Sequence, residues 1–257
     1  MNKKDSLGDR MKSQYEDRTR YSLPRRTYTI IRLDGKAFHT FTRKFNRPYD
    51  ERITDWMDGA AYHLCEEIQG VQFAYVQSDE ISLLLTDFAT IQSQSWFDGN
   101  IQKNVSIAAS IATAHFNELR ILSCMTKQVD PLIANKPAYF DARAFTIPDP
   151  VEVANYFIWR QQDAVRNSIQ MLAQSLYSHK ELQGKNTSEL QELTFQKGKN
   201  WNDISIRNKR GGFIEKKQYK ILNGPEANED FSIRNKWEIS ECPNFTVDSL
   251  KNYIPRI

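Results

Sequence analysis

The spacing of apolar residues changes along the chain between a period of two and a period near 3.6, and each change marks a predicted element. Residues 27–33 are rich in β-branched and aromatic side chains, which predicts a strand ending at Asp34. From Asp50 onward, apolar side chains recur at helical spacing until Gly70. This pattern predicts a helix with Asp50 as its N-cap and Gly70 just beyond its end.

Two further strands, a second helix and a last strand complete a predicted core. Residues 71–76 and 81–86 indicate strands joined by a polar turn. Small residues recur in 104–122, which predicts a helix packed closely on a sheet, and residues 138–147 predict the last strand. The order β-α-β-β-α-β defines an α+β fold of the ferredoxin-like kind, which serves both RNA-recognition domains and polymerase palms.

Outside this core the sequence predicts mainly helices. Ser6 is placed to cap a strongly charged N-terminal helix. Residues 151–182 have the apolar spacing of one long helix. Residues 187–197 predict a short helix that Thr187 or Ser188 would cap.

We expect the chain to have two parts. Residues 1–148 form a palm-like core together with the N-terminal helix. Residues 149–257 form a helical and β-hairpin extension packed on that core, because the character of the chain changes after a Pro-Asp-Pro sequence. The hairpin is predicted to begin at Phe213 and to finish near Trp237.

The composition is that of a folded protein without a large excess of charge. Hydrophobic residues make up 40% of the 257, which is enough for a sizeable core. The net charge of +3 permits a nucleic-acid partner without arguing for one. The 3 cysteines are far apart, which argues against a disulfide scaffold or a cysteine zinc site. With no apolar run suited to a secretory signal or a membrane span, we expect a cytoplasmic protein.

Acidic residues stand at the ends of predicted strands. Asp34 and Gly35 follow the first strand, and Ser78, Asp79 and Glu80 form the turn between the next two. In a β-α-β-β core these strands are neighbours, so the two turns can meet. Close carboxylates repel each other unless a cation lies between them, and Mg²⁺ favours oxygen ligands of this kind. On the pattern alone, the alternative is that both aspartates only cap turns.

Three short sequence motifs occur in a specific order along the chain. Residues 31–39 read IRLDGKAFH, residues 47–50 read RPYD, and residues 73–82 read FAYVQSDEIS. They resemble the R-x-D-G-x-x-F-H, K/R-P-x-D and A-Y-G-Q-S-D-E-[YI]-S blocks of the tRNA-histidine guanylyltransferase superfamily. Weaker similarity in residues 159–163 and 199–202 extends the resemblance over most of the chain.

This resemblance implies an enzyme that adds nucleotides to the 5′ end of an RNA, usually a tRNA, in the 3′–5′ direction. ATP or GTP would activate a 5′-monophosphate, which the 3′-hydroxyl of an incoming NTP would then attack. Two Mg²⁺ ions on the palm are the implied cofactors, and tRNA and NTPs are the implied partners. The resemblance also implies a homo-oligomer, commonly a tetramer.

Position by position, the resemblance assigns roles to individual residues. It makes Asp34 and Asp79 catalytic metal ligands, with the Gly35 carbonyl assisting, and Glu80 a further catalytic candidate that orients them. The implied nucleotide-contacting residues are Arg32, Asp34, Gly35, Lys36, Ala37, Phe38, His39, Arg47, Asp50, Ser78 and Asp79. The candidates for RNA contact in the extension are Arg166, Asn167, His179, Lys180, Arg207 and Arg210.

Departures from the family pattern separate the preferred function from its alternatives. Val76 stands where the family usually has Gly, and residues 166–170 read RNSIQ where eukaryotic enzymes carry an H-I-N-N-L-Y-N-T block for histidine tRNA. This region is similar to the bacterial and archaeal branch, whose members copy a template to repair truncated 5′ ends. The alternatives are addition of a single G to histidine tRNA and a non-catalytic RNA-binding module. His179 and Lys180 have their own alternative, which is to neutralise the predicted helix C-terminus.

Overall fold

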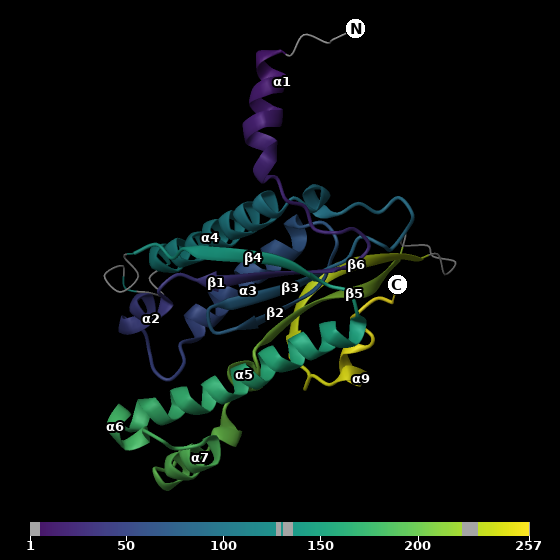
Figure 1. Cartoon of the computed structure of the whole chain (residues 1–257). Coiled ribbons are helices and arrows are strands. Elements are labelled where there is room, and N and C mark those ends of the chain that lie inside the picture. Colours follow the sequence, from purple (N-terminus) through teal and green to yellow (C-terminus); the bar gives the residue numbers. More distant parts are fainter. Residues whose placement is uncertain (1–5, 127–129, 131–135, 223–230, 257) are drawn as a thin grey trace.

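Within the residues that the structure describes, six antiparallel strands form one sheet with the order β4-β1-β3-β2-β5-β6. The computed structural model of the chain, shown in Figure 1, describes residues 6–126, 130, 136–222 and 231–256. Its strands are β1 (Tyr28–Gly35), β2 (Val71–Gln77), β3 (Glu80–Leu85), β4 (Phe140–Ile147), β5 (Gly212–Leu222) and β6 (Phe231–Glu241).

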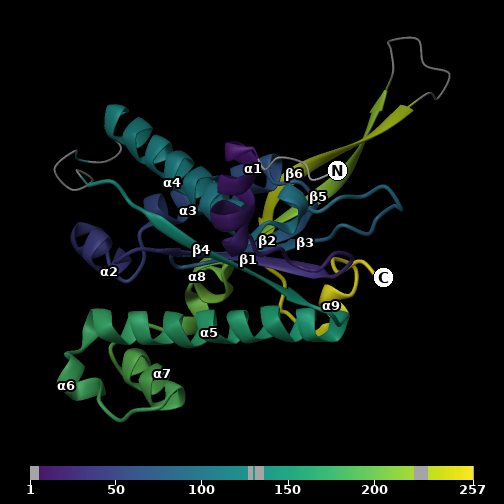
Figure 2. The same ribbon diagram turned by 45° about the horizontal axis from the view of Figure 1, so that its top comes forward.

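Helices cover both faces of the sheet. Figures 1 and 2 show α3 and α4 on one side and α5 on the other. The α-helices are α1 (Leu7–Met11), α2 (Phe38–Phe41), α3 (Glu51–Glu67), α4 (Ile101–Met125), α5 (Pro150–Leu176), α6 (His179–Leu182), α7 (Thr187–Gln196), α8 (Ile206–Arg210) and α9 (Val247–Leu250). Shorter helical turns are the π-helix η1 (Lys12–Glu16) and the 3-10 turns η2 (Asp17–Thr19), η3 (Thr42–Lys44), η4 (Trp96–Gly99) and η5 (Trp201–Asp203).

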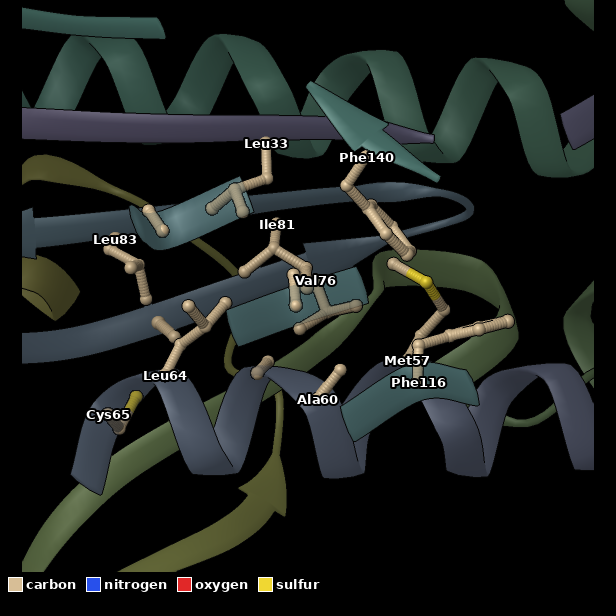
Figure 3. Close-up of a cluster of buried hydrophobic side chains, with 14 of the residues drawn as sticks. Leu33, Met57, Ala60, Leu64, Cys65, Val76, Ile81, Leu83, Phe116 and Phe140 are labelled. Carbon is tan, nitrogen blue, oxygen red and sulfur yellow. The ribbon is translucent and has the colours of Figure 1, made fainter. Parts of the chain in front are cut away.

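Alternation along the strands gives each face of the sheet its own hydrophobic core. In β1, Ile31 and Leu33 belong to the core beneath α3 and α4, whereas Tyr28 and Ile30 belong to the core beneath α5. Figure 3 shows the first core, in which side chains of α3 and Phe116 of α4 pack against the strands. Burial on both faces fixes the register of the central strands and hence the position of their ends.

The α+β class and the order of the predicted core elements are confirmed. β4, β1, β3 and β2 are neighbours in that order, and α3 and α4 connect them along the chain. Asp50 caps α3 by accepting a hydrogen bond from the N–H of Arg52 at 3.1 Å. The C-terminal hairpin is also confirmed, since β5 and β6 pair along their length, although its tip at residues 223–230 lies outside the described residues.

The prediction of one continuous helix over residues 151–182 is wrong. α5 ends just before Tyr177, which is extended, with φ −133° and ψ 153°. The Tyr177 hydroxyl donates a hydrogen bond to a backbone carbonyl oxygen of α7 at 2.8 Å, which holds the break in place. His179 and Lys180 therefore lie in the separate single turn α6, beyond the end of the long helix.

Two helices begin at other residues than predicted. α4 starts before residue 104 because the Asn100 side chain accepts a hydrogen bond from the backbone N–H of Lys103 at 3.0 Å. α7 is capped by Asn186 and not by Thr187 or Ser188, through a capping box with an accepted hydrogen bond of 3.0 Å. In both places an asparagine amide serves as the cap, as serine and threonine commonly do.

The N-terminal helical segment makes little contact with the rest of the chain. Ser6 caps it as predicted, by accepting a hydrogen bond from the N–H of Asp9 at 3.0 Å. None of the residues in α1, η1 or η2 is buried, and Figure 1 shows the segment projecting away from the sheet and its helices. No helix within the described residues has the length and apolar character needed to cross a membrane.

Candidate active site

The two acidic turns meet at one end of the sheet, as the sequence predicts. β1 and β3 are antiparallel neighbours, and their register places Asp34 opposite Glu80. The Gly35 N–H donates a hydrogen bond to the backbone carbonyl oxygen of Asp79 across 3.0 Å. A backbone hydrogen bond therefore connects the two turns directly, without the help of any side chain.

Burial and neighbouring charge act together on Asp79. Burial raises the pKa of Asp79 above its ordinary value, and the negative charges of Asp34 and Glu80 raise it further. Hydrogen bonds from its own backbone N–H and from the Ser78 side chain oppose this rise without cancelling it. A divalent cation beside the two aspartates would reverse the effect, because it favours the ionised carboxylate.

The donor set at these turns fits magnesium. It consists of the Asp34 and Asp79 carboxylates and the carbonyl oxygen of Gly35, all of them hard oxygen donors. Within the part of the chain that the structure describes, no three His, Cys, Asp or Glu side chains form a metal-binding group by themselves. Magnesium is commonly bound through one or two carboxylates and takes its other ligands from water and substrate phosphates.

The segment after Gly35 is shaped by an aromatic core. Phe38 is only 5% exposed, and its ring centroid lies 5.5 Å from that of Phe116 and 5.3 Å from that of Phe140. A Cβ atom on Gly35 would lie 2.2 Å from Cδ2 of Phe38, so glycine is needed here to make room for that ring. Ala37 is left-handed, with φ 54°, and turns the chain into α2. The Phe38 side chain therefore positions the loop.

A pocket of about 410 Å³ opens beside the second acidic turn. Its wall comes from the loop and helix start at residues 38–54, the turn at 77–79, α5 and α8. A volume of this size accommodates a nucleotide. The predicted site residues in the wall are Phe38, His39, Arg47, Asp50, Ser78, Asp79, Asn167 and Arg207. The wall does not include Arg32, Asp34, Gly35, Lys36, Ala37, Glu80, Arg166, His179, Lys180 and Arg210.

Asp50 and Arg47 both line the pocket, but Asp50 is buried and paired whereas Arg47 is exposed. Burial would raise the pKa of Asp50, but hydrogen bonds from the Arg52 side chain and the Asn46 N–H, with the charge of Arg52, bring it below its ordinary value. The Arg52 Nη2 to Asp50 Oδ2 distance is 2.6 Å. Asp50 thus anchors the loop, whereas Arg47 is exposed and can approach a ligand.

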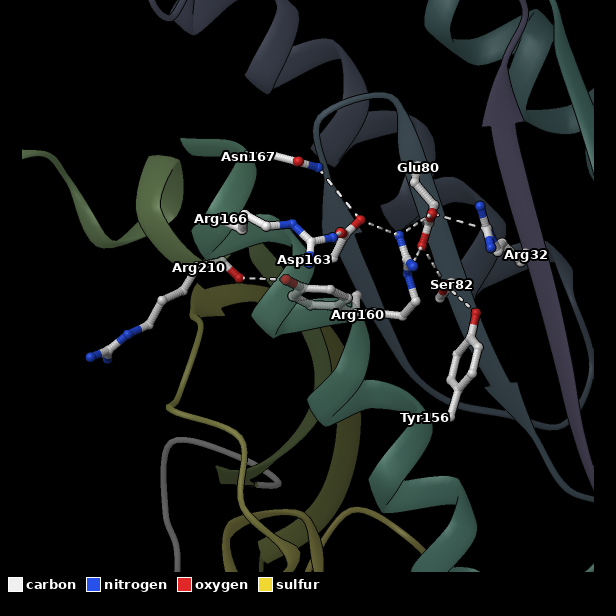
Figure 4. A network of polar contacts seen from close by, with 10 residues as sticks. Arg32, Glu80, Ser82, Tyr156, Arg160, Asp163, Arg166, Asn167 and Arg210 are labelled. Carbon is white, nitrogen blue, oxygen red and sulfur yellow. Dashed lines mark hydrogen bonds and ion pairs between the residues drawn. The ribbon is translucent and has the colours of Figure 1, made fainter. Parts of the chain in front are cut away.

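Glu80 is engaged by arginines, as Figure 4 shows. It is 5% exposed, and its two carboxylate oxygens accept hydrogen bonds from Nε and Nη2 of Arg160, each at 2.9 Å. Nε of Arg32 lies 3.0 Å from Oε2 of Glu80, an ion-pair contact that lacks the alignment of a hydrogen bond. Neither Glu80 nor Arg32 lines the pocket, so the geometry gives both a supporting position behind the acidic turns.

Two of the three predicted RNA-contacting arginines pair with carboxylates of the protein itself. Arg207 donates two hydrogen bonds to the Asp58 carboxylate, at 2.8 and 2.6 Å. Arg166 pairs with Asp163 on the same helix. The Arg210 side chain extends away from the polar network in Figure 4. Arg166 comes from α5, Arg207 and Arg210 come from α8, and His179 and Lys180 come from α6.

Two residues at this site were not among those predicted from the sequence. Gln77 lies in the pocket wall at 5% exposure, and its Oε1 finds no hydrogen-bond partner among the described residues, as suits an acceptor for a ligand. Arg160 holds Glu80. The signals were present, since Gln77 directly precedes Ser78 in one motif block and Arg160 belongs to the similar segment 159–163.

A sheet that joins two acidic turns beside a pocket of this size suits metal-assisted phosphoryl transfer. The family model described as "tRNAHis guanylyltransferase" matches residues 8–148, which is more than half of the chain. The chain belongs to this family, whose members are nucleotidyltransferases acting on tRNA.

Similarity to solved structures extends beyond the matched segment. A bacterial tRNA(His) guanylyltransferase (Thg1)-like protein in complex with ATP is 38% identical, with a TM-score of 0.83, and covers 97% of this chain and 99% of its own. A bacterial Thg1-like protein in complex with GTP is also 38% identical, with a TM-score of 0.77 and 97% coverage of both chains. The uncharacterized protein R259 of Acanthamoeba polyphaga mimivirus is 30% identical over 236 residues, 85% of this chain and 80% of its own length.

Proposed function

We propose that this chain is a metal-dependent 3′–5′ nucleotidyltransferase that repairs truncated 5′ ends of tRNA by copying a template. The observation that carries the proposal is the 3.0 Å hydrogen bond from the Gly35 N–H to the Asp79 carbonyl oxygen, which holds both acidic turns together beside the pocket. The ATP and GTP complexes of the bacterial Thg1-like proteins support a nucleoside triphosphate as ligand.

In this proposal the sheet serves as a ferredoxin-like polymerase palm. Asp34, Asp79 and the carbonyl of Gly35 would hold two Mg²⁺ ions, which activate a hydroxyl and neutralise the phosphate that it attacks. Ser78 and Arg47 line the adjoining pocket, where a hydroxyl and a guanidinium can hold a triphosphate. ATP or GTP would be the activating substrate.

Template-dependent repair is preferred over addition of one G because of α5. Its residues Asn167, Ser168 and Met171 line the pocket, in the region where the histidine-tRNA block is replaced. Dedicated guanylyltransferase activity on histidine tRNA is the second candidate, which the family description favours. A non-catalytic RNA-binding module has no support, because the family consists of enzymes. The proposal includes a cytoplasmic homotetramer, as the family resemblance implies.

The test is an assay of nucleotide addition to the 5′ end of tRNA. The protein is incubated with Mg²⁺, four NTPs and 5′-monophosphorylated tRNAs that lack their first nucleotide, with full-length histidine tRNA in parallel. Asp34→Ala is expected to lower the rate by about 10³-fold or more, because loss of a metal ligand removes several kcal/mol of transition-state stabilisation. Asp203→Ala, at an exposed position outside any helix cap, serves as the matched control.

The outcomes separate the candidates. Restoration of the missing nucleotide on several tRNAs, lost in Asp34→Ala and kept in Asp203→Ala, supports template-dependent repair. Addition restricted to histidine tRNA supports the dedicated guanylyltransferase. Full activity of Asp34→Ala would contradict the metal assignment, and no addition to any of the tRNAs would contradict both candidate functions.

A further inference from the structure

Arg160 connects α5 to Glu80, which directly follows Asp79 in the second acidic turn. It comes from α5, is 5% exposed, and donates two hydrogen bonds to the Glu80 carboxylate, each at 2.9 Å. We propose that Arg160 is a positioning residue that keeps Asp34 and Asp79 in the geometry needed to bind a divalent cation. The inference rests on the proposed function, because it concerns the metal site named there.

Glu80 connects Arg160 to both aspartates. It follows Asp79 directly in the chain, and it stands opposite Asp34 in the register of β1 and β3. A displacement of Glu80 therefore changes the position of one metal ligand through the backbone and of the other through the strand pairing. Arg160 holds this shared point with two parallel hydrogen bonds, which fix orientation as well as distance.

The surroundings of Arg160 require an arginine. Its guanidinium lies 4.3 Å from the ring centroid of Trp159, and its Nη2 donates a second hydrogen bond to Oδ2 of Asp163 at 3.0 Å. A planar fork can bind two carboxylates and contact an aromatic ring at once, whereas a lysine ammonium presents a single point of charge. A buried ion pair contributes little net stability compared with apolar side chains, so a role in orientation accounts better for this one.

The same network continues toward the pocket. Asp163 pairs with Arg166 and accepts a hydrogen bond from Asn167 at 3.5 Å, and Asn167 lines the pocket wall. Figure 4 shows these residues in one chain of contacts from α5 to the acidic turn. Arg160 thereby fixes the position of the metal-binding turns relative to α5, whose residues form another side of the pocket.

The test measures metal binding directly, without turnover. Mn²⁺ is titrated into the wild type and into Arg160→Lys, and free Mn²⁺ is followed by electron paramagnetic resonance, with thermal melts of the same samples. Loss of a residue that orients metal ligands typically weakens metal affinity about 10- to 100-fold, and we expect a change of that size in Arg160→Lys. Arg120→Lys is the matched control, since Arg120 is an arginine of similar burial, 8% exposed, on α4.

Each outcome decides the matter. Weaker Mn²⁺ binding in a cooperatively melting Arg160→Lys, with Arg120→Lys unchanged, supports positioning, because a purely structural role would lower the melting temperature alone. Unchanged Mn²⁺ affinity in Arg160→Lys overturns the inference. If that variant does not melt cooperatively, Glu80→Gln replaces it, and unchanged affinity there overturns the inference equally. A wild type that binds Mn²⁺ no better than Asp34→Ala overturns the metal site and the proposed function with it.

Discussion

The ionised Asp79 side chain destabilises the metal-free protein. Its pKa in the folded chain is raised, first by burial and then by the charge of Asp34, so the folded state holds this proton more tightly than the unfolded chain. The stability that the protonated form provides is present below the ordinary pKa of an aspartate and is lost as the pH rises through the raised pKa. At neutral pH the carboxylate is therefore retained at a cost in folding free energy.

Asp79→Asn is expected to stabilise the metal-free protein while abolishing nucleotide addition. Removing the buried charge at neutral pH should raise Tm by about 1–3 °C, and the gain should shrink as the pH is lowered. Differential scanning calorimetry without divalent cations measures this, with Asp203→Asn as the control. Mg²⁺ should then raise the Tm of the wild type but not of the variant. A loss of Tm at every pH would contradict this account of Asp79.

Individual roles at the site could be predicted from the sequence only in part. The meeting of the Asp34 and Asp79 turns was predictable, because both residues end strands whose adjacency follows from the element order. The burial of the Phe38 ring and the engagement of Glu80 by Arg160 were not. These depend on which way a side chain points and on a helix 80 residues further along the chain, and no local pattern encodes either of them.

At the scale of elements, α5 depends on its N-terminal cap. Asp149 accepts hydrogen bonds from the backbone N–H groups of Val151 at 2.8 Å and Glu152 at 3.1 Å, and Pro150 occupies the first helical position. Asp149→Ala should lower the free energy of unfolding by about 1 kcal/mol, which corresponds to about 2–4 °C in Tm. Thermal melts beside the control Asp203→Ala measure it. Equal melts of the two variants would show that the cap does not stabilise the fold.

Element boundaries were predictable where local chemistry sets them. α3 begins at the cap Asp50 and ends before Gly70, which is left-handed with φ 89°, and both signals are local. The break between α5 and α6 was missed, because it depends on the hydrogen bond of Tyr177 to a backbone carbonyl of α7, a contact made in three dimensions. Tyrosine by itself does not end helices, so the apolar spacing predicted one helix.

The whole molecule is built around one sheet to which both ends of the sequence contribute. Phe73, Ala74, Tyr75 and Val76 of β2 pair with the start of β5, so the C-terminal hairpin extends the sheet of the core. The sequence predicts the hairpin but not its pairing with β2, because pairing between distant strands leaves no local pattern. As a result the predicted core and extension share one sheet, and α5 covers the face opposite α3 and α4.

The N-terminal segment should contribute almost nothing to the stability of this assembly. Leu7 and Tyr15 are 66% and 67% exposed, and an isolated helix of this length is marginal in water. The chain is attached to the rest of the fold after this segment, at Leu23. The backbone N–H of Leu23 donates a hydrogen bond to the carbonyl oxygen of Gly99 at 2.9 Å. Deletion of residues 1–19 should therefore change Tm by less than about 1 °C in dilute protein. A fall of several degrees that grows with protein concentration would show instead that the segment packs against another copy of the chain.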